Sequence, residues 1–441
     1  MKEVLSNKNR NLIVIVLLLI SCILGIIVCI TNNSNEKLIF YSIGYIVAIL
    51  STCFIEKFKI ISVPVLFSGF HFAFIGGSPI FKYLRLGEYC DEQYAIILFS
   101  YILFVFAYYM CELLFTKVKK LGTNKHSKQI NISTYKILIL LMWIASVVAN
   151  IIFIIKGNFL NGNLETTRVT AMQGNGILVY LSWLGIIANC MYFELFLKKK
   201  GKLSTFIITS AITIILSLML GYRSRLITYV LIILMMYNKT KKIKNFYVII
   251  IALVGIIIVA LLGILRANMS NLESNSLLNE ILIILDNGST NIQYMFDYFP
   301  EKVPFQHGST FLINILMLLP GPDMDFTLWL KEKLNLTFAG GGVTPTLLGE
   351  FYINFNYIGV LIGFALLGIV AYYLQKYYSN SEKVFFSSLL FHQFVGSVRG
   401  GLGNIETNLL VFSIAYWGVY LISKKIKIID YGGKNEENSI I

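Results

Sequence analysis

Arginine beside glycine is the pattern in this sequence that points most directly to chemistry. The segments Gly221-Tyr-Arg-Ser-Arg225 and Val398-Arg-Gly-Gly-Leu-Gly403 both contain it. The planar guanidinium group carries a rigid fork of N–H donors that holds a phosphate or carboxylate in two places at once. Glycine lets backbone N–H groups approach an anion closely. Both segments therefore indicate an anion-binding site.

Three further arginines stand in related settings. Arg168 lies in a polar segment, and Arg266 directly follows a long apolar one. Arg85 has acids close by in the sequence, and we expect it to pair with an acid such as Glu88 or Asp91. The candidate anion-binding residues are therefore Arg168, Arg223, Arg225, Arg266 and Arg399.

The composition defines the elements that must hold these residues. Hydrophobic residues make up 56% of the 441 residues, charged residues 14%, and the mean hydropathy is +0.72. Soluble globular domains carry about 25% charged residues. The values exclude a water-soluble enzyme, a disordered chain, a coiled coil and a collagen. Six cysteines in so long a chain exclude a disulfide scaffold. The sequence predicts an all-α polytopic membrane protein.

A helix needs about 20 apolar residues to cross the roughly 30 Å hydrocarbon core. Twelve segments are predicted to do so: Asn11–Ile30, Leu38–Ile55, Ile60–Phe81, Tyr94–Phe115, Lys136–Ile155, Gly176–Leu197, Leu203–Leu220, Leu226–Tyr237, Phe246–Leu265, Phe351–Leu374, Val384–Val398 and Leu409–Ile422. The eighth and the eleventh are short, and the eighth would measure only about 18 Å at 1.5 Å per residue.

Lysine and arginine in the connections set the orientation. With a cytoplasmic N-terminus and twelve crossings, 25 of the 37 basic residues fall on the cytoplasmic side. Omitting one crossing would place lysine clusters on both sides of the membrane. We therefore expect both termini in the cytoplasm. Topology also explains the net charge of +14, so no nucleic-acid partner is needed.

Arginine and lysine distribute differently in this topology. Six of the seven arginines fall on the outer side, whereas 24 lysines fall on the inner side. The orientation rule treats the two residues alike, so it does not explain the difference. The short eighth and eleventh spans would draw Arg223, Arg225 and Arg399 below the outer headgroups. We predict a shallow cationic pocket in the outer leaflet, suited to an amphiphile with a phosphate or pyrophosphate group.

The predicted organisation has four parts. Residues 1–265 form a membrane domain with helices 1–9, 266–350 a large outer loop, 351–425 a membrane domain with helices 10–12, and 426–441 a cytoplasmic tail. Within the loop, Leu277–Leu285 and Phe311–Pro320 are apolar runs too short to span. They predict helices that lie on, or dip into, the outer surface.

No cofactor has a signature in the sequence. Neither HExxH nor a nucleotide-binding glycine loop occurs. Asp323 and Asp325 are a short carboxylate pair without a third ligand nearby, so we expect no metal. His307 is the only histidine on the outer side, and Glu350 stands at the mouth of the tenth span, where an arginine could pair with it.

In their order along the chain, these motifs resemble those of the Wzy-type polymerases. They are Thr167-Arg168, Gly221-Tyr-Arg-Ser-Arg225, Leu265-Arg266-Ala, a Leu319-Pro-Gly321 break, Gly341-Gly-Val-Thr-Pro-Thr-Leu-Leu-Gly-Glu350 and Val398-Arg-Gly-Gly401. The resemblance covers residues 40–425. Asn356 departs from it, because capsule-type members more often have glycine after Asn-Phe.

The resemblance implies a polymerase of oligosaccharide repeat units for O-antigen, capsule or enterobacterial common antigen. Such enzymes join units carried on a polyisoprenyl pyrophosphate at the outer face of the bacterial plasma membrane. The growing chain moves from its lipid pyrophosphate to the non-reducing end of a new lipid-linked unit, so no cofactor is needed. The implied partners are the lipid-linked donor and acceptor and the bilayer, with a chain-length regulator and a flippase as further candidates.

This mechanism gives the candidate residues their roles. The five candidate arginines would bind the pyrophosphate, and Arg225 and Arg399 would also stabilise the leaving group as its charge develops. A general base must take the proton of the acceptor hydroxyl. Glu350 is the first candidate for this base and His307 the second.

Three other functions remain open. A glycan ligase uses the same donor with another acceptor. A flippase or transporter also fits twelve spans, but transporters place polar groups near the bilayer midplane, where this chain has only His71 and His392. A glycosyltransferase that uses a polyprenyl-phosphate sugar would carry an acidic pair in the first outer loop, where residues 31–37 offer only Glu36.

Overall fold

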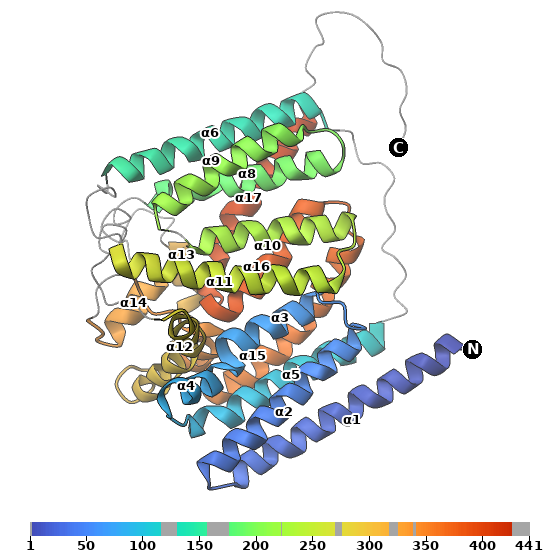
Figure 1. Ribbon diagram of the computed structural model, residues 1–441, viewed down its shortest axis with the longest axis vertical. Coiled ribbons are helices and arrows are strands. Elements are labelled where there is room, and N and C mark those ends of the chain that lie inside the picture. The colour runs from blue at the N-terminus through green and yellow to red at the C-terminus, as the bar shows by residue number, and fades with distance from the viewer. Residues whose placement is uncertain are drawn as a thin grey trace, which may run out of the picture.

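The computed structural model describes residues 2–115, 130–156, 176–221, 223–269, 276–316, 325–337 and 341–425, which form a bundle of helices without strands (Figure 1). The elements are α1 (Lys2–Ile30), α2 (Ser34–Ile55), α3 (Val63–His71), the π-helix η1 (Phe72–Gly76), α4 (Ser78–Leu86), α5 (Asp91–Phe115), α6 (Ile132–Lys156), α8 (Gly176–Leu197), α9 (Leu203–Met219), α10 (Arg223–Thr240), α11 (Asn245–Met269), α12 (Leu277–Tyr298), α13 (Thr310–Leu316), α14 (Phe326–Lys333), α15 (Thr346–Asn380), α16 (Val384–Gly400) and α17 (Gly403–Lys425).

Nine helical segments in the described part of the chain are long and apolar enough to cross a membrane. Each of the twelve predicted spans coincides with a helix, the third with the run from α3 to α4. The shorter helices α9, α10 and α16 have 17, 18 and 17 residues. The chain is therefore a multi-pass membrane protein, and the count of twelve crossings stays a prediction.

The third span is interrupted by the π-helix. The Gly77 N–H donates to the Phe72 carbonyl at 2.7 Å, which is the i−5 pattern of a π-helix. Pro79 contributes to the break, because it has no N–H to donate to the Ile75 carbonyl four residues before it. The single helix expected here is therefore two short helices with a π-helical turn between them.

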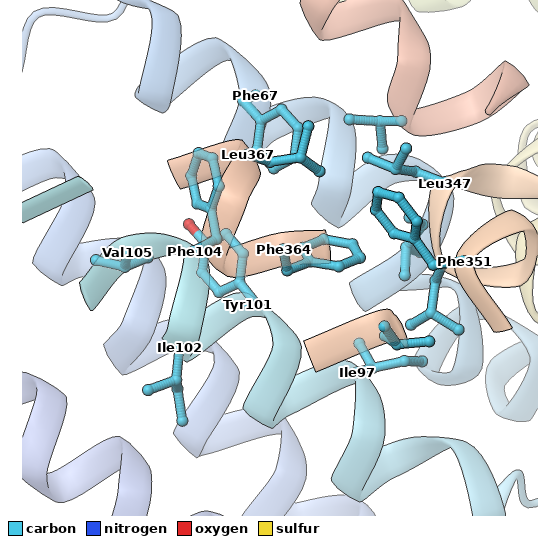
Figure 2. Packing of buried hydrophobic residues seen from close by; sticks show 14 of the residues in the cluster. Phe67, Ile97, Tyr101, Ile102, Phe104, Val105, Leu347, Phe351, Phe364 and Leu367 are labelled. Atoms are coloured by element: carbon cyan, nitrogen blue, oxygen red, sulfur yellow. The ribbon is translucent and has the colours of Figure 1, made fainter. Parts of the chain in front are cut away.

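Apolar side chains pack into two main cores. The first lies among α1, α2, α3, α5 and α15, and Figure 2 shows the part of it where Phe67, Phe104 and Phe364 meet. The rings of Phe67 and Phe104 stack with their centroids 4.2 Å apart. The second core lies among α6, α8, α10, α16 and α17.

Helix α16 belongs to both cores. Phe391 and Val398, two turns apart, lie in the first core, whereas Phe385 and Leu389 lie in the second. The helix packs on α3, α10, α15 and α17. Arg399 lies in the last turn of α16, next to Val398 of the first core.

Helices α12, α13 and α14 gather at one end of the bundle, opposite the N-terminus (Figure 1). We name this the loop end. Helix α12 has 22 residues, far more than the predicted run Leu277–Leu285. Its polar second half is buried against α4 and η1, where Gly288 leaves no room for a side chain beside the Phe74 carbonyl. The Ser289 N–H donates to Ser78 Oγ at 2.6 Å. The expected surface helix is thus part of the packed bundle.

Three helices extend beyond their predicted bounds. Helix α10 begins at Arg223, so the segment Gly221–Arg225, which we expected to connect the seventh and eighth spans, is largely helical. Helix α11 continues past Arg266, and α15 begins before Glu350, so both residues are helical although we placed them in the large loop. The second apolar run of that loop begins as α13, and its residues after Leu316 lie outside the described part.

Helix α15 is sharply kinked. Phe355 has φ −141° and ψ 21°, and Asn356 has φ 59° and ψ −164°. The rings of Phe351 and Phe364 lie 6.1 Å apart, whereas a straight helix would separate these positions by about 20 Å. The first turns of α15 therefore fold back on the rest of the helix, and this carries Glu350 to the loop end.

We predict that Asn356→Gly raises the thermal stability and Asn356→Val lowers it. The backbone conformation of Asn356 is one that essentially only glycine adopts freely, and it costs other residues of order 1–3 kcal/mol. The bond from the Tyr357 N–H to Asn356 Oδ1, at 2.7 Å, offsets part of that cost. The measurement is the unfolding midpoint of the detergent-solubilised protein. A midpoint that falls in the glycine variant would contradict this account of the kink.

Candidate active site

Glu350 anchors the turn that follows α16. Its side chain is fully buried, and its carboxylate oxygens accept the backbone N–H groups of Leu402 and Gly403, the latter at 3.0 Å. The Thr310 hydroxyl donates to the same carboxylate at 3.3 Å. Helix α17 begins at Gly403, so Glu350 satisfies N–H groups at a helix N-terminus, where negative charge is favoured.

Glycine is required at two positions of this turn. Gly401 has φ +78°, and a side chain there would collide with the Glu350 carboxylate. A Cβ at Gly403 would stand 3.0 Å from Glu350 Oε1 and 2.8 Å from the Thr310 carbonyl oxygen. The glycines that we expected to admit an anionic ligand therefore also admit the protein's own carboxylate.

Two asparagines complete the network. Asn354 donates to Thr310 Oγ1 at 2.7 Å and to the Glu350 carbonyl at 2.8 Å. Asn314 donates to the Gly403 carbonyl at 2.8 Å. Sequence analysis missed Thr310, Asn314 and Asn354. A signal was present, because Glu350 and Asn354, like Thr310 and Asn314, are four residues apart and so share a helix face.

His307 lies beside this network. Its backbone N–H donates to the Asn354 carbonyl at 3.2 Å, and the Gly308 N–H donates to Asn354 Oδ1 at 2.7 Å. The residue has φ +48° and is exposed. The structure therefore brings both candidate bases, His307 and Glu350, to the loop end, where Asn354 connects them.

Arg399 is an exposed cation two residues before Gly401. Its guanidinium carbon lies 5.5 Å from the centre of the Phe74 ring. Within the described ranges, no carboxylate pairs with Arg399 and no hydrogen bond uses its donors. Its N–H fork is therefore open to a ligand.

Arg225, by contrast, is fully buried. Its Nη1 donates to Asn150 Oδ1 at 3.1 Å and its Nη2 to Ser182 Oγ at 2.7 Å. Its guanidinium carbon lies 4.8 Å from the centre of a Trp183 ring. A buried charge needs such partners, because water no longer solvates it. These contacts join α10 to α6 and α8. This environment holds helices together, whereas we expected Arg225 in a shallow pocket that binds an anion.

Arg225 and Arg399 lie at one level of the bundle. Helices α10 and α16 pack side by side, and Lys239 Nζ donates to Ser387 Oγ at 2.7 Å near the C-terminal end of α10 and the N-terminal end of α16. The helices are thus antiparallel. At a rise of 1.5 Å per residue, Arg225 lies about 21 Å from Lys239 toward the N-terminus of α10, and Arg399 lies about 18 Å from Ser387 toward the C-terminus of α16. Because the helices are antiparallel, both distances run in the same direction. Their side chains contact different neighbours, α6 and α8 for Arg225 and η1 for Arg399.

The other candidate arginines are less completely described. Arg168 lies outside the described residues, as do the side chains of Arg223 and Arg266. The backbone places Arg223 at the first residue of α10 and Arg266 in the last turn of α11.

Arg85 pairs with Asp286 of α12, so the expected partners Glu88 and Asp91 are wrong. These two acids pair with lysines instead. The reason is the packing of α12 on α4, which the sequence did not indicate. Burial raises the pKa of Asp286, and the hydrogen bond from Arg85 opposes this rise.

No cluster of three metal-ligating side chains occurs in the ranges that the structure describes. Asp325 caps helix α14 and accepts the Leu328 N–H at 2.9 Å. Asp323, its expected companion, lies outside those ranges.

Fold and site together define a multi-pass helical membrane protein with arginines fixed at one end of its bundle. The sequence model of the family described as O-antigen polysaccharide polymerase Wzy matches residues 11–427 of the 441. The chain belongs to this family, which confirms the resemblance of its motifs, and its general role is that of a polysaccharide repeat-unit polymerase. No curated protein and no solved structure matches the chain.

We predict that Glu350→Gln loosens the turn between α16 and α17. The amide keeps one acceptor oxygen but turns an NH₂ group toward a backbone N–H, which leaves a buried donor unsatisfied at a cost of about 1–3 kcal/mol. Amide hydrogen exchange of a peptide covering residues 400–404 should become faster, while peptides of α5 should not change. Unaltered exchange at 400–404 would show that Glu350 does not anchor the turn.

We also predict different effects of lysine at the two arginine positions. Arg225→Lys should lower the stability by about 3 kcal/mol, because one ammonium group does not replace a fork that bonds to Asn150 and Ser182 together. Arg399→Lys should leave the unfolding midpoint nearly unchanged, because the side chain is exposed. Equal midpoints for the two variants would refute the buried role of Arg225.

Proposed function

We propose that the protein joins oligosaccharide repeat units carried on a polyisoprenyl pyrophosphate, at the outer face of the plasma membrane, with lipid pyrophosphate as the leaving group. The family membership supports a polymerase in general. The observation that carries the finer proposal is Arg399, an exposed arginine with open donors in the last turn of α16, directly before the turn that Glu350 anchors.

The proposed reaction exchanges one bond at the anomeric carbon of the donor glycan. The bond from this carbon to a pyrophosphate oxygen breaks, and a bond to the acceptor hydroxyl oxygen forms. The hydroxyl proton passes to a base, and the electron pair of the broken bond leaves with the lipid pyrophosphate. The main task is to stabilise the charge on that leaving group, and fixed guanidinium donors do so best where water is partly excluded.

We assign direct contact with the pyrophosphate to Arg399. Arg168, Arg223 and Arg266 are proposed as further pyrophosphate-binding residues from their positions in the sequence. Arg225 would act indirectly, because its guanidinium group already donates to Asn150 and Ser182. It would fix the start of α10, where Arg223 lies.

We propose His307 as the general base in preference to Glu350. The Glu350 carboxylate already accepts three hydrogen bonds and is fully buried, so a substrate hydroxyl would have to displace one of them. His307 is exposed and next to the same network. Imidazole is also the side chain that most often serves as a general base.

The outer orientation is supported by the lysine-rich connections. Lys198–Lys202, Lys239–Lys244 and Lys376–Lys383 follow or precede helices at the ends remote from Arg399. Basic connections mark the cytoplasmic side of membrane proteins. The loop end would then face the periplasm or the cell exterior.

We predict that Arg399→Ala and Arg399→Lys both abolish long glycan chains. The assay is a gel ladder of lipid-linked glycan in a strain that lacks the gene and receives each variant. Single repeat units should accumulate, because lysine presents a point charge in place of a two-pronged fork. Arg85→Lys is the matched control, since its ion pair with Asp286 survives, and it should give a normal ladder.

Long chains from Arg399→Ala would refute the assignment of Arg399. Purified protein supplied only with single lipid-linked units separates the polymerase from a ligase, because only a polymerase lengthens them. A wild-type protein that leaves these units unextended would refute the proposed function itself.

A further inference from the structure

The π-helix η1 packs against the end of α16 and contacts Arg399. π-Helices are rare, and they occur frequently at functional sites. Its central residue, Phe74, presents its ring to the Arg399 guanidinium at 5.5 Å, within the range of a cation–π contact. The sequence reading gave this segment no role beyond spanning the membrane.

A ring holds a cation differently from a carboxylate. A carboxylate would occupy the N–H fork and neutralise its charge. An aromatic face attracts the flat side of the guanidinium and leaves the donors in the guanidinium plane available. The ring of Phe74 therefore suits an arginine that must be fixed in place and still bind an anion.

Buried tyrosines hold the π-helix from behind. The Tyr41 hydroxyl donates to the Gly76 carbonyl at 2.5 Å, and Tyr45 fills the space where a side chain at Gly76 would lie. The Tyr45 hydroxyl also bonds to His71 Nδ1, one residue before η1. Tyr41, Tyr45 and His71 are all fully buried. His71, directly before the π-helix, and Gly76, its last residue, are thus both hydrogen-bonded to side chains of α2.

Helix α12 fixes the same segment from its other side. Gly288 brings the α12 backbone against the Phe74 carbonyl, and the Ser289 N–H donates to Ser78 Oγ at 2.6 Å. The Phe74 backbone is therefore held between α2 and α12, which fixes the point from which its ring extends to Arg399.

We propose that η1 positions Arg399. The Phe74 ring is the surface that fixes the guanidinium group, which we call its seat, and Tyr41, Tyr45 and His71 act by holding η1 in place. This inference rests on the proposed function of Arg399 in binding pyrophosphate. It assigns Phe74 as a positioning residue, because the ring acts through the arginine.

The first test changes the ring without changing its shape. Phenylalanine analogues with one, two and three ring fluorines, placed at position 74, weaken cation–π attraction stepwise while they keep nearly the same size. The initial rate at which purified protein extends single lipid-linked units should fall about twofold with each fluorine, and about tenfold in Phe74→Leu. Phe70→Leu, whose ring lies 6.0 Å from that of Phe74 in the preceding turn, is the matched control and should stay near wild type. A rate that does not follow fluorination would overturn the proposal.

The second test removes one buried hydroxyl at a time. Tyr41→Phe should lower the rate about fivefold and should lower it no further in combination with Phe74→Leu, because both changes act on the same seat. Tyr101→Phe is the matched control. Its hydroxyl bonds to Ser68 Oγ at 2.5 Å and to Thr52 Oγ1 at 3.1 Å and not to η1, so its loss, with the ring kept in place, should cost similar stability without the same effect on the rate. Equal rates for the two tyrosine variants would overturn the role of the Tyr41 contact.

A measurement that does not depend on polymerase activity separates this inference from the proposed function. Phenylglyoxal modifies accessible arginines, and inorganic pyrophosphate should protect Arg399 from it, as measured by mass spectrometry. Protection should weaken about fivefold in Phe74→Leu and remain in Phe70→Leu. If protection is equal in both variants, the seat is refuted even though Arg399 binds pyrophosphate. If wild-type protein is not protected, the pyrophosphate role fails, and the inference fails with it.

Discussion

The buried carboxylate of Glu350 is the contact on which the arrangement of the loop end depends. It joins the starts of α13, α15 and α17, which are far apart in the sequence. Its oxygens accept hydrogen bonds from the Thr310 hydroxyl and from the backbone N–H groups of Leu402 and Gly403. A buried carboxyl group is stable only when its oxygens are hydrogen-bonded, so separating the three segments would leave buried acceptors unsatisfied. The turn that directly follows Arg399 and α16 is fixed by this requirement.

A second carboxylate acts at the opposite end of α16. Glu194 of α8 accepts the N–H groups of Val384 and Phe385 at 3.2 and 3.3 Å and pairs with Lys198 at 2.8 Å. Negative charge stabilises a helix N-terminus, and Glu194 therefore stabilises the start of α16 as Glu350 stabilises the start of α17. Buried acids from two other helices thus hold both ends of α16, the helix that bears Arg399.

Much of the fold was predictable, because a lipid environment demands long apolar segments that can be read from the sequence. Each predicted span coincides with a helix. The length of α12 was not predictable in this way, because its buried second half is polar, and its partners on α4 and η1 are more than 200 residues away in the sequence. The pairing of Arg85 with Asp286 was missed for the same reason.

The candidate site was predicted in its residue types but not in its contacts. The arginine–glycine segments did mark the turn after α16, and Glu350 and His307 do lie at the loop end with it. The burial of Arg225 could not be read from composition, because it depends on single polar side chains of α6 and α8 that look ordinary in an apolar sequence. Sequence analysis marked Asn356 only as a departure from the family resemblance and did not predict the kink, for which its φ of 59° supplies the physical reason.

The shared position of α16 between the two cores limits how relatives of this protein can be recombined. A chimaera that takes one core from each of two parents must split the packing partners of α16, so one face of the helix will meet side chains from the wrong parent. A crossover in the connection before α6 avoids this mismatch only under two conditions. Helices α15, α16 and α17 must come from the same parent, and the residues of both cores that pack on α16 must come from that parent as well. Exchange of helices between relatives is thus constrained by the packing of α16 as well as by the candidate site.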